Sequence, residues 1–338
     1  MTAGPPFAWA RGGRALAWGG VAASVALAPW LGGAPLALLL LPLALSTVVF
    51  GLPHGALDVF VPFWMERRPL RAGRLALYAA AYLAAAGATL VAWWAAPTAA
   101  ALGFIALTWF HWGQGDLFAL RGMRWDGHLR TPAQRALAVA VRGALPMAVP
   151  LLAFPQTYAD VVGAMAGALL GDGAPARAAV LGLPHAEVAL GLGALWAASL
   201  AAGAWAARAS RQPRRAWRTW ALDAAEVAGL AVFFAVVPPL WAVGVYFCLW
   251  HAVRHLERLG PLQTRPASAW RLAAAAAPLS AGALALIAGL AVTVGATADR
   301  PLDAAGLYLV GIAALTVPHV LVVVWMDVRQ RVWVAPVP

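Results

Sequence analysis

Residues 249–255 read Leu-Trp-His-Ala-Val-Arg-His and place two histidines, His251 and His255, four positions apart in an apolar run. In an α-helix four residues make about one turn, so both imidazoles leave the same face of the helix. A helix can offer two ligands to one metal ion in this way when other helices bring ligands to the same depth. The pair alone is compatible with a metal, a haem or neither, so its meaning depends on the rest of the chain.

The composition around this stretch is that of an integral membrane protein. Of the 338 residues 63% are hydrophobic and only 11% are charged, whereas about a quarter of the residues in a soluble domain are charged. The net charge of +11 comes from arginine alone, because the sequence contains no lysine. Arginines in short loops between apolar segments are typical topology signals of membrane proteins, so we expect no nucleic-acid partner.

The apolar segments predict the fold class. We expect an all-α, polytopic membrane helix bundle of about ten transmembrane helices, which forms a single integral membrane domain over residues 1–338. The predicted spans lie near residues 15–31, 36–63, 75–96, 101–120, 136–154, 186–207, 220–237, 239–257, 272–295 and 304–327.

The arginines predict the orientation of these spans. With ten spans, every arginine except Arg177 and Arg300 falls on one side, which the positive-inside rule makes the cytoplasm. We therefore expect a multi-pass protein of the cytoplasmic membrane with both termini inside. Two segments leave alternatives open. Residues 158–170 are short enough for a re-entrant or surface helix, and the first apolar run could be a cleaved signal peptide rather than the retained span that the topology favours.

Five histidines fall inside the predicted spans, at His54, His111, His251, His255 and His319. All lie between the mid-plane and the cytoplasmic end of helices that run from outside to inside. Four separate helices therefore present histidine to one leaflet, and burying such residues without partners is costly. A metal site is the economical explanation, since neutral imidazole suits iron, copper and zinc. The other two histidines, His128 and His185, lie in or beside loops and are expected to be surface residues.

Acidic and aromatic residues lie at similar depth. Metal-bound histidines usually donate their second N–H to a carboxylate or carbonyl, so the acids could orient the ligands; the alternative is pairing between helices or with Arg254. The aromatic residues could line a pocket for a large apolar substrate, although core packing is the ordinary role. The acids are Asp58, four residues after His54, with Asp116, Asp223 and Glu226, and the aromatic residues are Phe110, Trp112, Tyr246, Phe247 and Trp250.

Four motifs resemble one known family. The segments Gly-Leu-Pro-His-Gly-Ala-Leu-Asp at 51–58, Phe-His-Trp-Gly at 110–113, Trp-His-Ala-Val-Arg-His at 250–255 and Pro-His at 318–319 resemble the Brp/Blh family in the same order. These prokaryotic, membrane-integral β-carotene 15,15′-dioxygenases make retinal for microbial rhodopsins. The resemblance runs from about residue 50 to residue 327.

The resemblance implies a site and a reaction. A non-haem Fe(II) ion would be held by His54, His111, His251 and His255, with His319 beside the ligands or the substrate. The substrates would be O₂ and β-carotene, or a related carotenoid taken from membrane lipid, and retinal could pass to a microbial rhodopsin. Three other classes remain open from the residues alone: a membrane haem protein, a di-iron desaturase or hydroxylase, and a transporter.

Overall fold

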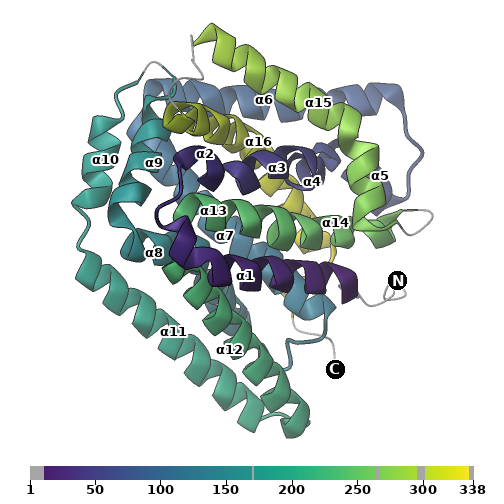
Figure 1. The fold of residues 1–338 in the computed structure, drawn as a ribbon. Helices are drawn as coiled ribbons and strands as arrows, with labels where there is room; N and C mark the ends of the chain where they lie inside the picture. The colour runs from purple at the N-terminus through teal and green to yellow at the C-terminus, as the bar shows by residue number, and fades with distance from the viewer. Residues whose placement is uncertain (1–10, 170, 264–266, 295–300, 335–338) are drawn as a thin grey trace.

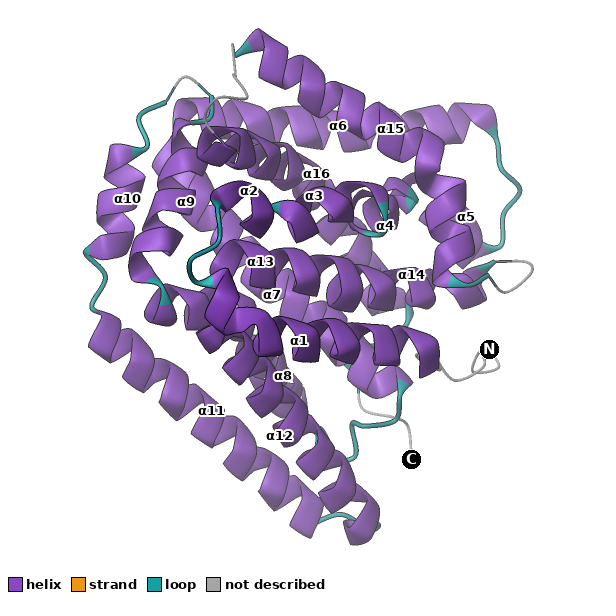
Figure 2. Cartoon of the chain, in the orientation of Figure 1, coloured by secondary structure: helices purple, strands orange, loops and turns teal. Residues whose placement is uncertain are grey.

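The computed structural model describes residues 11–334, except residues 170, 264–266 and 295–300. In this part of the chain every regular element is a helix, as Figure 2 shows. The elements in chain order are α1 (Arg11–Leu31), α2 (Leu36–Leu39), α3 (Leu41–Val48), α4 (Gly51–Ala56), η1 (Asp58–Phe60), α5 (Val61–Glu66), α6 (Ala72–Ala95), α7 (Pro97–Gly122), α8 (Pro132–Ala153), α9 (Pro155–Gly167), α10 (Ala174–Leu181), α11 (His185–Arg208), α12 (Pro213–Val236), α13 (Pro239–Val245), η2 (Tyr246–Ala252), α14 (Val253–Leu259), η3 (Gly260–Leu262), α15 (Ala269–Thr293) and α16 (Pro301–Arg329).

The all-α prediction is confirmed, and each of the ten predicted spans coincides with helical structure. By length and hydropathy, seven helices of the described chain could cross a membrane. The segments containing α1, α7 and α13–α14 are helical but are not among those seven. The number of ten spans and the cytoplasmic placement of the termini remain predictions.

Two contacts bring both ends of the described chain to the connection between α7 and α8. Near the start of α1, the guanidinium of Arg14 lies 4.4 Å from the ring centre of Trp125. After the end of α16, the carbonyl of Arg331 accepts a hydrogen bond from Arg121 at 2.7 Å. The start of α1 and the end of α16 therefore lie at the same end of the bundle, as an even number of spans requires. Arg300 and the first ten residues lie outside the described part.

Proline and side-chain caps explain where several helices begin. Proline occupies one of the first two positions of α7, α8, α9, α12 and α13, where its missing N–H leaves no hydrogen bond unmade. At α8 the hydroxyl of Thr131 accepts from the backbone N–H of Gln134, and the Gln134 side chain accepts from the backbone N–H of Thr131. This reciprocal capping box fixes the start of a helix that packs against the centre of the bundle.

The predicted span 36–63 is helical but not continuous, because α2, α3, α4, η1 and α5 divide it. Pro42, Pro53 and Pro62 each remove a backbone donor, and Gly51 and Gly55 lower the helix propensity between them. The break at Leu57 separates His54, in α4, from Asp58, which begins the 3₁₀ turn η1. A spacing of four residues predicts that His54 and Asp58 share one face of a helix. Because of this break, the two side chains do not lie on the face of one regular helix.

Glycines let α7 and α8 pack at very short range. A Cβ atom on Gly113 would lie 2.0 Å from the Val139 carbonyl oxygen, and one on Gly143 would lie 1.8 Å from the Trp109 carbonyl oxygen. Each helix thus offers a glycine to the backbone of the other, the small-residue contact typical of membrane helices. This packing holds the end of α7 that carries His111 in a fixed position.

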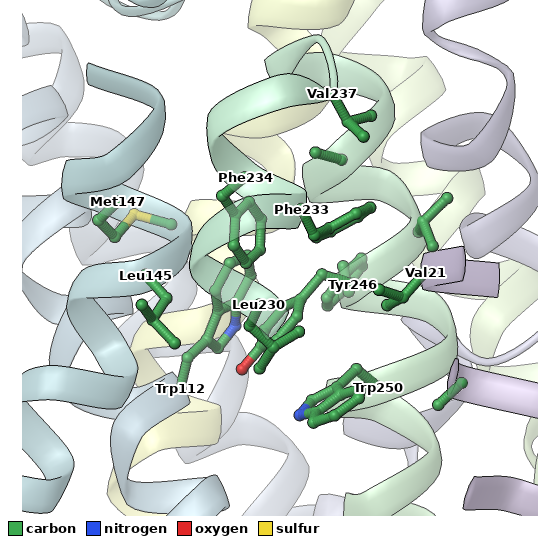
Figure 3. Close-up of a cluster of buried hydrophobic side chains, with 14 of the residues drawn as sticks. Val21, Trp112, Leu145, Met147, Leu230, Phe233, Phe234, Val237, Tyr246 and Trp250 are labelled. Atoms are coloured by element: carbon green, nitrogen blue, oxygen red, sulfur yellow. The ribbon is translucent and has the colours of Figure 1, made fainter. Parts of the chain in front are cut away.

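A large apolar core surrounds this pair of helices. Figure 3 shows buried side chains from α1, α7, α8, α12 and η2 converging on it, among them Trp112, Phe233 and Trp250. The undecided segment 158–170 falls mostly in α9, which packs against α16, α7 and the neighbouring α10; Leu170 lies outside the described residues. Figure 1 shows α9 and α10 together at one side of the bundle.

Candidate metal centre

The five predicted histidines meet in one place. They come from α4 (His54), α7 (His111), η2 (His251), α14 (His255) and α16 (His319), and all five are buried. The ring centres of His54 and His319 are 4.8 Å apart, as are those of His111 and His251. The convergence predicted from their common depth is therefore present in the structure.

The ligand atoms of the cluster fit a single metal ion. One ring nitrogen from each of His54, His111, His251 and His319 can be chosen so that all four lie within 4.8 Å of one another. Ligands on opposite sides of a metal with M–N bonds of about 2.1 Å lie about 4.2 Å apart, so small side-chain adjustments would close such a site. A second group overlaps the first and joins His319 to His255 and Asp58.

Three of the histidines are oriented through Nδ1. His319 Nδ1 lies 2.7 Å from Asp58 Oδ2, His111 Nδ1 lies 3.4 Å from Gln114 Oε1, and His54 Nδ1 contacts the Gly51 carbonyl oxygen. An Nδ1–H donated to each of these oxygens leaves Nε2 as the free lone pair. This is the arrangement of metal-ligating histidines, whose partners fix the tautomer and the ring direction.

Several histidine nitrogen atoms without hydrogen-bond partners also favour a metal site. The Nε2 atoms of His111, His251, His255 and His319 are buried without a hydrogen-bond partner among the described residues. Buried polar atoms are otherwise almost always paired, and each exception needs an explanation. Three of these histidines, His111, His251 and His319, belong to the four-nitrogen group, where one bound metal ion would satisfy their free nitrogens together. The residues present therefore fit a metal.

A π-helical turn positions one member of the histidine pair His251 and His255. Tyr246–Ala252 forms η2, and α14 follows at Val253, so His251 lies in the π turn and His255 in the α-helix. The π turn contains one residue more than an α turn, and such turns occur frequently at functional sites. The two imidazoles belong to different candidate ligand groups. His251 lies in the group of four histidines, and His255 lies in the group with Asp58 and His319.

The acids divide into two sets. Asp58 bonds His319, whereas Asp116 and Glu226 belong to a buried ionic network with two arginines. Arg142 Nη1 lies 2.7 Å from Asp116 Oδ2 and 2.9 Å from Glu226 Oε1, and Arg254 Nη2 lies 3.0 Å from Glu226 Oε1. Arg254 also bonds Asp116. The pairing with Arg254 that was left open as an alternative is therefore present for both acids.

The network also corrects one prediction. His128 was expected at the surface, but it is buried, and its Nε2 lies 2.8 Å from Asp223 Oδ2. Asp223 in turn bonds Arg142. The loop that carries His128 folds back onto α12, so proximity to arginines in the sequence did not indicate exposure. His185, by contrast, is half-buried at the start of α11.

A cavity of about 700 Å³ reaches the histidine cluster. His54, His111, His251 and His319 form part of its wall, and most of the other lining residues are apolar. Of the predicted substrate-binding aromatics, Trp112 and Phe247 line this cavity. Tyr246 and Trp250 lie instead in the apolar core, and Phe110 is 37% exposed.

Several polar residues of the site were not predicted to be part of it. Tyr82 Oη lies 3.2 Å from Asp58 Oδ2 and 2.9 Å from the Leu315 carbonyl oxygen, so its proton is shared between the two acceptors. Gln114 Nε2 donates to Asp327 at 2.8 Å, and Arg258 bonds the same carboxylate. The signal in the sequence was polarity within apolar spans. Tyr82 shows it weakly because its ring is largely apolar, and Asp327 shows it weakly because it is the last residue of the predicted span 304–327.

The bond between Asp58 and His319 makes a testable prediction. Replacing Asp58 with alanine removes the acceptor of His319 Nδ1–H, so we expect the affinity for the metal to fall about 10–100-fold. Asparagine at this position keeps an accepting oxygen and should retain most of the affinity. Tyr82→Phe, which leaves the carboxylate in place, is the matched control. Metal titration of the purified proteins measures the effect, and an unchanged affinity in Asp58→Ala would contradict it.

Fold and site together define an all-helical membrane protein in which a buried histidine cluster that fits a metal ion faces a largely apolar cavity. The chain belongs to the family described as Beta-carotene 15,15'-dioxygenase, whose profile matches residues 45–327.

Curated relatives agree with this assignment. The chain is 42% identical to the "Probable beta-carotene 15,15'-dioxygenase Blh" of Halobacterium salinarum over 94% of its own length and 93% of the relative. It is 30% identical to the Brp protein of the same species, covering 86% and 84% of the two chains. A "Beta-carotene 15,15'-dioxygenase" of an uncultured marine bacterium is 25% identical over 83% and 91%. No solved structure matches the chain.

Proposed function

We propose that this protein cleaves β-carotene, or a closely related carotenoid, with O₂ at the central 15,15′ double bond and releases retinal. The observation that carries the proposal is that the histidine cluster borders the apolar cavity. Four histidines with metal-ligand spacing form part of the wall of a largely apolar cavity of about 700 Å³. An apolar polyene could lie in that cavity with one double bond beside the histidines, and family membership supplies the reaction.

The reaction balances without a further co-reactant. One C=C bond and the O–O bond break, and two C=O bonds form, with one oxygen atom in each aldehyde. For a symmetric carotenoid cut at its centre, both aldehydes are retinal. No electron donor is consumed, so the site needs to hold only the polyene, O₂ and the metal.

We propose Fe(II) as the metal, held by His54, His111, His251 and a fourth histidine. When bound, the ion would supply O₂ activation. The contribution of the protein is to position the ligands and the substrate. Asp58, Gln114 and the Gly51 carbonyl orient the imidazoles of His319, His111 and His54, respectively. Trp112 and Phe247 line the cavity next to His111 and His251. They would hold the polyene against the site and exclude water, and such positioning alone contributes strongly to rate.

The fourth ligand is either His255, as the resemblance implies, or His319, as the spacing of ring nitrogens favours. His319 belongs to both candidate groups, and its ring lies 4.8–5.0 Å from those of His54, His111 and His255. We expect His319→Ala to lose bound iron, and His255→Ala to retain part of it. Iron content per protein, with X-ray absorption to count nitrogen ligands, measures the difference. Full iron content in His319→Ala would assign the fourth position to His255.

We propose a location in the cytoplasmic membrane as a multi-pass protein, which fits the seven candidate spans. The substrate would then be drawn from membrane lipid, and retinal could be passed to a microbial rhodopsin in the same membrane.

The decisive experiment is expression of the chain in bacteria that accumulate β-carotene. Loss of the carotenoid colour and appearance of retinal in an extract would support both substrate and reaction. A protein that binds the carotenoid without forming an aldehyde would overturn the proposal, and a Soret band in the purified protein would indicate haem instead.

A further inference from the structure

The cavity beside the histidines has two unlike ends. One end is lined by residues of α6 and α15 that are exposed on the outside of the bundle. Leu83 is 53% exposed, Leu279 is 41% exposed and Leu286 is 60% exposed. In a membrane-embedded bundle, apolar side chains with this exposure face lipid. The cavity therefore opens to the membrane on this side.

The two helices at this opening both contact α16, but their other partners differ. α15 packs against α4 and α14, whereas α6 packs against α16 and α7. Figure 1 shows both helices along the same edge of the bundle. Gly282 lies at the opening on α15, and a Cβ atom built on it would meet nothing within 4 Å. The space in front of Gly282 is therefore open.

The other end of the cavity is closed. It is lined by Pro146 and Pro150 of α8, Val162 and Met165 of α9, and Leu240 of α13, all of which are buried. Val162 and Met165 also belong to a buried apolar cluster with Ala313 of α16. These two side chains therefore face the interior of the bundle and not the lipid.

The histidines lie between these two ends. α4, which carries His54, packs against α15 at the open end, and α7, which carries His111, packs against α8 and α9 at the closed end. α16, which carries His319, packs against α6 on one side and α9 on the other. A linear molecule that enters at α6 and α15 must therefore pass the histidines before it reaches the closed end.

We infer that the carotenoid enters from the lipid between α6 and α15 and advances until its leading ring meets α8, α9 and α13. The depth of the closed end then selects which double bond lies at the histidines. This inference rests on the proposed function and goes beyond it, because it assigns the route of the substrate and the residues that set the cleavage position.

The route is tested with Gly282→Trp. A Cβ atom at position 282 meets no atom within 4 Å, so the indole begins in open space and would obstruct the opening. The initial rate on β-carotene in phospholipid vesicles should fall at least about tenfold, within the one to three decades over which association rates of variants differ. Iron content and melting temperature should stay unchanged. Gly289→Trp is the matched control, since Gly289 is also exposed on α15 in open space but does not line the cavity.

The depth is tested with Val161→Phe, at a half-buried α9 position that lines the closed end. A shallower end stops the leading ring earlier, so the bond at the histidines lies nearer to that ring. Cleavage should then yield two aldehydes of unequal length, resolved by chromatography and mass spectrometry. Val161→Leu adds less volume and should give a smaller fraction of unequal products, and Val232→Phe at a lipid-exposed position of α12 should give retinal alone.

The outcomes separate this inference from the proposed function. A wild-type protein that forms no aldehyde would overturn the proposed function. A wild-type protein that forms retinal, with Gly282→Trp as fast as Gly289→Trp, would overturn the route. If Val161→Phe and Val161→Leu bind iron and form retinal alone, at any rate, the depth does not select the bond.

Discussion

Replacing His251 with alanine is expected to abolish bound iron and retinal formation together. Its Nε2 is buried without a partner in the described chain, and one of its ring nitrogens belongs to the four-nitrogen group. Its ring centre lies 4.8 Å from that of His111 and 5.3 Å from that of His54. Removal of one of four ligands leaves three nitrogens and an apolar gap that cannot take the place of the imidazole.

Iron is measured per purified protein and retinal is measured in extracts of carotenoid-producing cells. His185→Ala, at the half-buried start of α11 and outside the cluster, is the matched control and should keep both at the wild-type level. A His251→Ala protein with wild-type iron and wild-type retinal formation would place the metal elsewhere. One with wild-type iron and no retinal would make His251 a residue of the reaction rather than of the metal site.

Replacing Arg142 with methionine is expected to cause the largest loss of stability. Its guanidinium is buried and bonds Asp116, Asp223 and Glu226. Methionine fills much of the volume but leaves the three carboxylates with Arg254, His128 and the Nε1–H of Trp250 as partners in the described chain. Removing one partner of a buried ionic pair costs about 3–5 kcal/mol. Unfolding in detergent, followed by circular dichroism against temperature or denaturant, measures the loss.

Arg177→Met is the matched control for this prediction. Arg177 pairs with Asp160 at the surface, where the two side chains are 46% and 42% exposed, and exposed pairs contribute about 0–1 kcal/mol. A loss of stability in Arg142→Met no larger than in Arg177→Met would show that the buried network is neutral to folding. The single replacement Asp116→Asn in the Arg142→Met protein should restore part of the stability, because it removes one carboxylate that has lost Arg142 while Glu226 stays paired with Arg254.

The sequence was sufficient to predict where the helices lie and that the histidines meet. Hydropathy over about 20 residues decides which segments are helical in a membrane, and each predicted span is helical in the structure. The shared depth of His54, His111 and His319 on different helices required them to converge if those helices were neighbours. Their neighbour relation itself depends on contacts such as Gly113 against Val139, which no periodicity encodes.

The orientation of individual side chains was less predictable, because it depends on local departures from ideal helices. The break at Leu57 sends Asp58 to His319 rather than to the face of His54. Trp112 of α7 lines the cavity, whereas Phe110, two residues earlier on the same helix, is exposed. Arg142 lies inside the predicted span 136–154, and only the position of α12 beside α8 shows that it pairs with three acids.

The π turn at Tyr246–Ala252 has a consequence for the length of the chain. Because it holds one residue more than an α turn, deletion of Leu249 would let the segment relax into continuous α-helix. The helices on either side would keep nearly the same orientation, because the lost residue is the one that the π turn holds in excess. A deletion in α13 or α14 would instead rotate everything before it by about 100° relative to the residues after it, the angle that one residue spans in an α-helix. We therefore expect the loss of one residue to be tolerated better within this turn than in the helices that flank it.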